Sequence, residues 1–505
     1  MSDSTSRPRR PALVLALLLF LVLGAGGGLA WLLAARGLRS PLRILLITPS
    51  QGGSGGLDSA TCRAIGALVQ DHLEAFGQAA VTSVTELPGN LEVLRSQPRV
   101  LLVQLEPSRQ GESLVLSYRH VWGDALAKDA PPAWTWSQGQ PLAPAQAFEA
   151  FLGGFPKPIS MAGGPWLVPR QPARFWDLIG ANARRLRNEN LEEAMLLADR
   201  VAAAEPTCAS PWILLGNLRY RRMLNSPAAF RQEQAETEGL IQRGLSMAPF
   251  HPRGTFLLSL LKADGGNQSE ALTLLMQARR RQPYNPTLLT GIAYAARGAG
   301  LLPLARRAMD LRDQLAFTSL QPQAVDITCL YTGEIERFEA SLQEQPGHLR
   351  STSGVLPFYR GYLALVRGDR GLAQREFKAA GILAHGYPNI LRLSQIYELI
   401  LEGQKDEAWR RLREYDQERI GMREPDGEFT LRLAEAYALI GDRASAMDMA
   451  GRAFARGFGC TAWYERSPML EPLRSLPKWK ALMQHLKERQ SLMEDRFPVG
   501  LLEDN

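Results

Sequence analysis

The side chains best suited to metal binding or nucleophilic catalysis in this 505-residue chain are its histidines and cysteines. The six histidines show neither His-Glu-x-x-His nor His-x-x-x-His spacing, which would place two imidazoles on one helix face. The four cysteines are each more than a hundred residues apart, so the chain has no Cys-x-x-Cys pair for zinc or redox chemistry. We expect no catalytic or metal-binding role for His72, His120, His251, His348, His385, His485, Cys62, Cys208, Cys329 and Cys460. A site assembled by the fold from distant histidines is the alternative.

Two short motifs raise further chemical possibilities. The loop "QGGSGGLD", residues 51–58, is glycine-rich like a phosphate-binding loop, but it lacks the Lys-Ser/Thr pair that such a loop needs. We interpret it as a flexible connection from a strand to a helix and expect no cofactor. The tripeptide Arg367-Gly368-Asp369 matches an integrin-binding sequence that also arises by chance.

A glycine followed five residues later by an alanine recurs along the second half of the chain. The copies are Gly266–Ala271, Gly300–Ala305, Gly368–Ala373, Gly403–Ala408 and Gly441–Ala446. A glycine just past a helix adopts the left-handed conformation without a Cβ penalty, and a small alanine lets the next helix pack closely. Alanines 271 and 305 are 34 residues apart, and alanines 373 and 408 are 35 apart. Such a period is typical of a solenoid of helix pairs.

This pattern resembles the tetratricopeptide repeat (TPR) family, whose 34-residue unit opens with Trp-x2-Leu-Gly, carries two alanine positions and closes with proline. The residues that match its opening are Trp212, Leu215 and Gly216, and one complete repeat matches at Ala271, Ala278 and Pro283. The resemblance implies about seven helix pairs over 174–458, one of them degenerate near 317–353. The 43 residues from Pro206 to Pro249 indicate an insertion. Residues 459–490 are expected to form a capping region with a polar outer face.

The resemblance also implies where a partner would bind. In the TPR family the ninth residue of each first helix tends to face the concave groove of the array. Counting back from the aligned alanines places five residues there, namely Asn217, Tyr294, Tyr362, Tyr397 and Glu435. Tyrosine suits peptide recognition because it combines apolar area with a hydroxyl group. A register error of two residues would instead make these rings part of the core.

Residues 42–155 differ in texture from the repeats. Strand-like runs lie at 42–50, 79–87, 99–107 and 113–123, with a helical stretch at 59–77 and a hairpin turn expected in "PSRQGES", residues 107–113. The order strand, helix, strand, helix, hairpin predicts a small α/β domain. It is similar to the TolB-like amino-terminal domain that often sits between a membrane helix and TPR units in bacterial envelope proteins. That resemblance implies association and no known catalysis.

The first residues predict a membrane anchor. No charge occurs between Arg10 and Arg36, and residues 11–35 exceed the roughly 20 residues that span a bilayer. A cleaved signal peptide ending near Ala30 is the alternative. Arginines in 1–43 outnumber acidic residues six to one, a net charge of +5, so 44–505 contribute only +2 of the total +7. The excess of basic residues is therefore concentrated around the predicted membrane segment and does not indicate nucleic-acid binding.

We expect residues 1–10 to stay in the cytoplasm of a bacterium and residues 44–505 to lie in the periplasm, because long domains are exported largely regardless of loop charge. The predicted function is a membrane-anchored scaffold or adaptor, not an enzyme, that holds a protein or peptide in the repeat groove. The alternative is a signalling or sensor module related to membrane-bound kinase or transcription-regulator chains, or an unrecognised envelope hydrolase.

Overall fold

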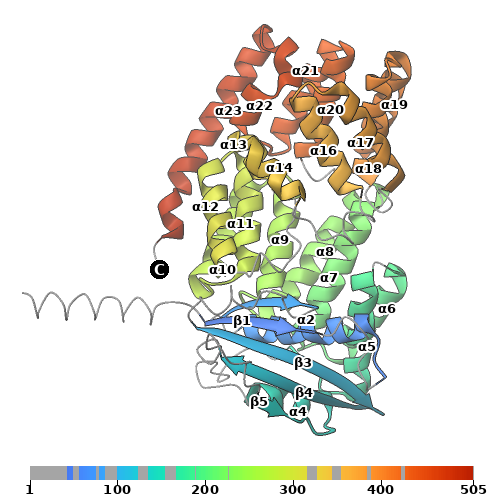
Figure 1. Ribbon diagram of the computed structural model, residues 1–505, viewed down its shortest axis with the longest axis vertical. Helices are drawn as coiled ribbons and strands as arrows, with labels where there is room; N and C mark the ends of the chain where they lie inside the picture. Colours follow the sequence, from blue (N-terminus) through green and yellow to red (C-terminus); the bar gives the residue numbers. More distant parts are fainter. Residues whose placement is uncertain are drawn as a thin grey trace, which may run out of the picture.

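The computed structural model describes residues 42–48, 56–75, 79–85, 99–122, 135–153, 167–187, 189–225, 227–315, 327–343, 354–383, 388–421 and 427–503. The predicted tail at 1–10 and membrane helix at 11–35 lie outside these residues. Within the described ranges, no helix combines the length and the apolar character that a membrane crossing requires. Figure 1 shows a small sheet at one end and a stack of helices above it.

The amino-terminal module is a five-stranded sheet of order β2-β1-β3-β4-β5. Its strands are β1 (Leu42–Ile47), β2 (Ala79–Val84), β3 (Val100–Gln110), β4 (Ser113–Trp122) and β5 (Thr135–Ser137). Strand β1 pairs in parallel with β2 and β3, and the β3–β4 pair is antiparallel. The four predicted strands are therefore present. The helix predicted between the second and third strands would lie between residues 87 and 99, and 88–98 are outside the described residues.

The β3–β4 hairpin is tighter than predicted. The strand pairing continues to Gln110 and Ser113, so the turn consists of Gly111 and Glu112 alone and not of residues 107–113. Gly111 has φ of 63°, a left-handed conformation that favours glycine in a two-residue turn. The proline of "PSRQGES", Pro107, lies within β3 opposite Leu116.

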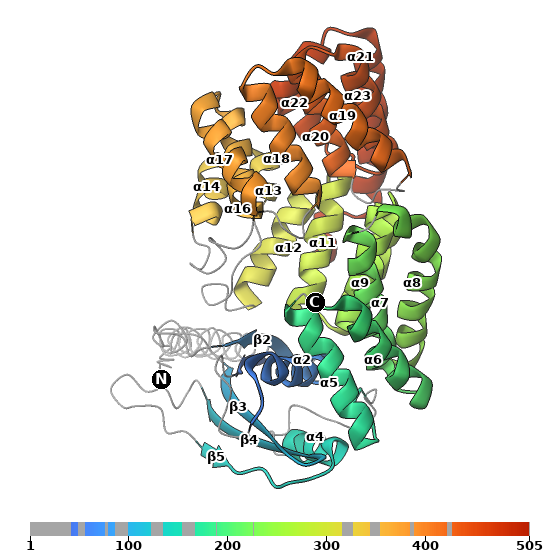
Figure 2. The same cartoon turned by 90° about the vertical axis from the view of Figure 1, so that its right-hand side faces the viewer.

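Alternation along the strands gives the sheet two apolar faces. Ile44, Leu46 and Leu101 belong to one large core that also contains helices α2 (Ser59–Ala75) and α4 (Pro144–Gly153). Leu45 and Leu102 belong to a smaller cluster. The large core continues without a break into the first helices of the array, so the module and the repeats share one interior (Figure 2).

The described helices that follow form eight antiparallel pairs, one more than the seven or so expected from the sequence. The pairs are α5 (Pro172–Arg187) with α6 (Leu191–Ala204), α7 (Ala209–Asn225) with α8 (Pro227–Met247), α9 (Pro252–Asp264) with α10 (Gln268–Arg281), α11 (Pro286–Ala299) with α12 (Leu302–Leu315), α13 (Ile327–Thr332) with α14 (Ile335–Gln343), α16 (Val355–Val366) with α17 (Arg370–Leu383), α18 (Pro388–Leu401) with α19 (Lys405–Gly421), and α20 (Gly427–Ile440) with α21 (Arg443–Ala455). The chain is thus mainly helical, with a TPR-like solenoid.

The glycine–alanine spacing has the structural meaning that the sequence predicted. All five glycines have φ between 79° and 95°, at positions 266, 300, 368, 403 and 441. All five alanines are fully buried, at positions 271, 305, 373, 408 and 446. The degenerate pair, α13 and α14, has the same kind of glycine but a different residue in place of the alanine. Its Gly333 has φ of 88°, but Phe338 stands five residues later in place of alanine and is also fully buried.

The region after the last pair does more than cover the end of the array. It comprises α22 (Thr461–Arg466), the 3₁₀ helix η3 (Pro468–Leu473), α23 (Pro477–Arg496) and the 3₁₀ helix η4 (Val499–Leu502). Helix α23 runs back beside α12 (Figure 1), and Phe497 and Leu502 pack into the core of α10, α11 and α12. Arg279 of α10 donates to the carbonyls of Leu501 and Leu502 at 3.1 and 2.8 Å. The predicted capping region at 459–490 is therefore part of a longer strap.

Candidate functional site: the inner face of the repeats

The five predicted groove residues all lie on the first helices of their pairs, but the structure separates them into three places. Tyr362 of α16, Tyr397 of α18 and Glu435 of α20 come together in the interior and are each 0% exposed. Asn217 of α7, much earlier in the chain, borders a small cavity. Tyr294 of α11 contacts a buried carboxylate.

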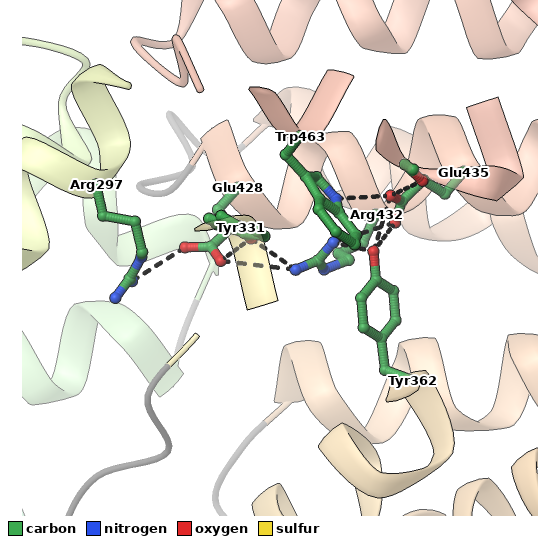
Figure 3. Close-up of polar contacts among 8 residues, drawn as sticks. Arg297, Tyr331, Tyr362, Glu428, Arg432, Glu435 and Trp463 are labelled. Atoms are coloured by element: carbon green, nitrogen blue, oxygen red, sulfur yellow. Dashed lines mark hydrogen bonds and ion pairs between the residues drawn. The ribbon is translucent and has the colours of Figure 1, made fainter. Parts of the chain in front are cut away.

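Glu435 is the centre of the first group (Figure 3). Its carboxylate accepts hydrogen bonds from the Tyr362 hydroxyl at 2.6 and 2.8 Å, from the Trp463 indole at 3.0 Å and from the Ser467 hydroxyl at 2.7 Å. Arg432, one helix turn earlier, completes the set with an ion pair at 3.2 Å. Each acceptor site of this buried carboxylate is thus occupied by the chain itself.

A second buried carboxylate, Glu428, lies beside the first group. It pairs with Arg297 of α11 at 3.1 Å and with Arg432 at 3.6 Å, and it accepts a hydrogen bond from the Tyr331 hydroxyl. Burial opposes ionisation, but Arg297 and Arg432 together hold the pKa of Glu428 below its usual value. We call these residues, with Tyr362, Glu435 and Trp463, the central network. Its two arginines balance its two glutamates.

The aromatic rings of the central network surround the Arg432 guanidinium. Its central carbon lies 3.9 Å from the ring centre of Tyr362, 5.7 Å from that of Tyr331 and 5.8 Å from that of Trp463. Burial raises the pKa of Tyr331 and of Tyr362 well above its usual value, so both hydroxyls remain donors at neutral pH. The arrangement is a cation-binding cage whose occupant is a side chain of the same protein.

Tyr362, Tyr397 and Glu435, three of the residues predicted to line the groove, are fully buried. Their inward direction agrees with the counted register, but α13, α22 and η3 occupy the space that a partner would need. Tyr397 donates to the Arg432 carbonyl at 3.0 Å, so its hydroxyl is also taken. The three side chains are therefore part of the interior although they point in the direction that the register predicts.

Tyr294 and Asn217 occupy the inner face of the earlier repeats. The Tyr294 hydroxyl donates to Asp264 at 2.6 Å, and Tyr220 donates to the same carboxylate. Burial raises the pKa of Asp264 to about 6, although the two tyrosine hydrogen bonds lower it. In this half of the array α2 of the sheet module covers the first helices, as the hydrogen bond from Asn182 of α5 to the Ala64 carbonyl at 3.3 Å illustrates.

Several members of the central network were not anticipated from the sequence. Arg432 lies within the apolar run "FTLRLAEAYALI". A charged residue on the inward face of such a helix is the sequence signal that could have identified it. Tyr331 lies in the degenerate pair, and Trp463 lies in the region expected to be only a cap. Neither of these two carried a repeat-based signal.

The four cysteines and two of the described histidines lie in the interior. All four cysteines are buried thiols that form no disulfide. His72 and His251 are buried too, and burial lowers the pKa of His72 to about 4. Among the residues that the structure describes, no three His, Cys, Asp or Glu side chains are grouped so that they could hold a metal ion.

Comparison with known proteins gives only distant likenesses. No protein-family model and no curated protein matches the chain. Three solved structures are similar: the APC/C hetero-tetramer Cut9-Hcn1 (13% identity, TM-score 0.39, 68% of this chain and 58% of that one), yeast Tom70 (12%, 0.35, 66% and 71%) and the P58(IPK) TPR domain (12%, 0.18, 65% and 99%). The chain thus spans little more than half the length of the Cut9-Hcn1 chain. These likenesses assign no activity or partner.

Proposed function

We propose that this chain is a scaffold that binds a partner protein on the outer face of its helix pairs. One observation carries the proposal. The inner face is filled by the chain's own side chains, whereas second helices of the pairs keep large apolar side chains in solvent. Leu372 and Ile382 of α17 are 36% and 63% exposed, and Trp409 of α19 is 41% exposed.

The chemistry of these side chains fits protein recognition. Tryptophan is enriched among the residues that contribute most to binding energy at protein interfaces. Trp409 is held in place, because its indole donates to Asp442 at 3.1 Å and Arg413 stacks on its ring at 5.0 Å. A side chain that is already ordered loses less conformational entropy on binding.

A partner in the concave groove, as the sequence predicts, would first have to displace α22 and η3. That step would leave Glu435 and Arg432 without the hydrogen bonds of Trp463, Ser467 and Tyr362, at a cost of several kcal/mol for buried charges. The outer face requires no such displacement, and for this reason we place the partner there.

The proposal includes the membrane anchor at 11–35 and a bacterial inner-membrane location with the repeats in the periplasm. It is supported by the uncharged run in the sequence and by the resemblance of 42–155 to the TolB-like domain. Fusions of alkaline phosphatase and of a fluorescent protein to the carboxyl terminus test it. An inactive phosphatase with a fluorescent partner fusion would place the repeats in the cytoplasm instead.

Partner binding is tested by co-purification of the full chain from membranes, with partners identified by mass spectrometry. The variant Leu372→Arg/Ile382→Arg is expected to lose at least one protein that the wild type retains. The matched control is Leu196→Arg on α6, where the replaced leucine is 67% exposed and lies on another pair. Equal recovery of every protein by both variants would contradict an interface on α17.

A further inference from the structure

A small cavity of about 30 Å³ lies where the sheet module meets the first repeats. Helices α2, α5 and α7 and the start of α9 line it. Leu214 and Arg253 of its lining are only half-buried, so the cavity borders solvent. Its polar lining residues are Asp71, Asn182, Arg185, Ser210, Asn217, His251 and Arg253.

Arg185 is the unusual member of this lining. It is 8% exposed, and its Nε donates to Asn182 at 2.8 Å, yet it forms no ion pair with any carboxylate in the described parts of the chain. The nearby Asp71 is paired with Arg253 at 3.2 Å. Burial, together with the nearby Arg253 and Arg221, lowers the pKa of Arg185 to about 9, so the guanidinium still carries its charge at pH 7. Buried charges are normally paired.

Two further polar groups of the cavity have no hydrogen-bond partner within the described ranges. The Ser210 hydroxyl and the Asn217 side-chain oxygen are buried, and neither has a hydrogen-bond partner among the described residues. Each residue is 9% exposed. Because most buried polar groups in proteins are satisfied, unpaired groups on one cavity point to a missing ligand or water. An asparagine amide can turn to present either its oxygen or its NH₂ group.

The charge and the volume of the cavity restrict the chemical class of ligand that it can bind. Arg185 and Arg253 oppose only Asp71, since burial lowers the pKa of His251, and the lining therefore has one excess positive charge. A water molecule needs roughly 10–15 Å³ of such space, so the cavity has room for about two oxygen-sized groups. A carboxylate has two oxygens and matches the planar fork of an arginine, whereas a phosphate has four.

We propose that this cavity binds the carboxylate group of a ligand, with Arg185 as its counter-ion and the Ser210 hydroxyl and Asn217 amide as further donors. The cavity receives only the carboxylate, and the rest of the ligand extends toward solvent. Because its walls come from both the sheet module and the repeats, an occupied site fastens one to the other. The site is independent of the outer face proposed for partner binding.

The test uses the purified full chain and three probes, sodium acetate, inorganic phosphate and sodium chloride, at equal ionic strength. A ligand that binds only the folded protein raises its melting temperature. We expect acetate to raise Tm by about 2–4 °C over chloride and phosphate to raise it less. A larger shift with phosphate, or none with acetate, would overturn the assignment. No partner protein is present, so failure here is separate from failure of the proposed scaffold function.

Variants locate the effect. Arg185→Met is expected to lose the acetate shift, while its Tm in chloride equals or exceeds that of the wild type because an unpaired buried charge is removed. Arg184→Met is the matched control, since Arg184 is the next residue on α5 and pairs instead with Glu193; it should keep the shift. If Arg185→Met does not fold, Ser210→Ala/Asn217→Ala should at least halve the shift. An undiminished shift in these variants would place acetate elsewhere and reject the site.

Discussion

The guanidinium of Arg432 lies 3.9 Å from the ring centre of Tyr362 and donates to the hydroxyl of the same residue, 70 positions earlier in the chain. This contact joins α16 to α20 across the pair between them. Because Glu435 accepts from Tyr362 and pairs with Arg432, three side chains from two repeats depend on one another. The interior is therefore held by polar as well as apolar contacts.

Replacement of Arg432 by Met should destabilise the protein strongly. It leaves Glu435 and Glu428 buried with less compensation, and removing one partner of a buried ion pair costs about 3–5 kcal/mol. The double variant Arg432→Met/Glu435→Gln should cost less than the sum of the two single changes, because the pair acts as a unit. Thermal unfolding of the four proteins measures both effects. The exposed pair Arg410–Glu407 provides the control, since Arg410→Gln should leave Tm unchanged within error. Additive losses would show that the two residues act separately.

The stability of the wild type should contain a pH-dependent contribution from Asp264. Burial raises the pKa of this carboxyl group to about 6 in the folded protein, above its ordinary value near 3.9. The folded state therefore holds the proton more tightly, and the stability falls as the pH rises from about 4 to about 6. Asp264→Asn removes this titration, so its Tm relative to the wild type should increase across that interval and stay constant above it. Parallel Tm profiles from pH 4 to 7 would contradict the assignment.

The cysteines should not react in the native protein. Burial raises the pKa of Cys208 and of Cys460 to about 12, and all four thiols lie in the interior, so little thiolate is accessible at pH 8. We expect no alkylation by iodoacetamide under native conditions and modification of all four cysteines in denaturant. Mass spectrometry counts the labels. Rapid native labelling of any one of them would show that its surroundings open readily.

A pair of glycine substitutions separates backbone strain from packing. Gly368 has φ of 80° and open space where a Cβ would lie, so Gly368→Ala should cost about 1–2 kcal/mol through the backbone alone. Gly451 also has open space but lies in the middle of α21 with an ordinary φ. Gly451→Ala should stabilise by about 0.5–1 kcal/mol. Opposite signs in Tm are expected, and a loss of stability in both would contradict this account.

The repeat architecture could be predicted because its signals are local. A left-handed glycine and a buried alanine five residues later are set by one turn and one helix contact, and each copy repeats them. The direction of Tyr362 and Tyr397 also follows from position within a repeat. What occupies the space in front of them does not, because Trp463 and Ser467 come from a segment with no repeat pattern, and the curvature that brings Tyr362 to Glu435 is a sum over several pairs.

The cavity beside Arg185 was beyond sequence reasoning for a related reason. Arg185 lies in the run "ANARRLRNEN", between Arg184 and Arg187, and nothing in that run distinguishes the buried arginine from its less buried neighbours. Only the docking of α2 on α5 makes one of them interior. Asn217 was singled out for its position in the groove, and the fold places it beside that arginine for a reason the repeat pattern does not contain.

The return of the carboxyl-terminal strap to α10 sets an order of events during synthesis. Solenoids usually fold by adding one unit to the next, since each repeat contacts only its neighbours. Here Arg279 finds the carbonyls of Leu501 and Leu502 only after 222 further residues have been made, which takes roughly 10–45 s at ordinary translation rates. Until then the side of α10 and α12 that Phe497 and Leu502 cover faces water in the nascent chain. Residues 497–502 therefore complete the core of helices encoded much earlier in the chain, and a chain that stopped before Phe497 would leave that core open to water.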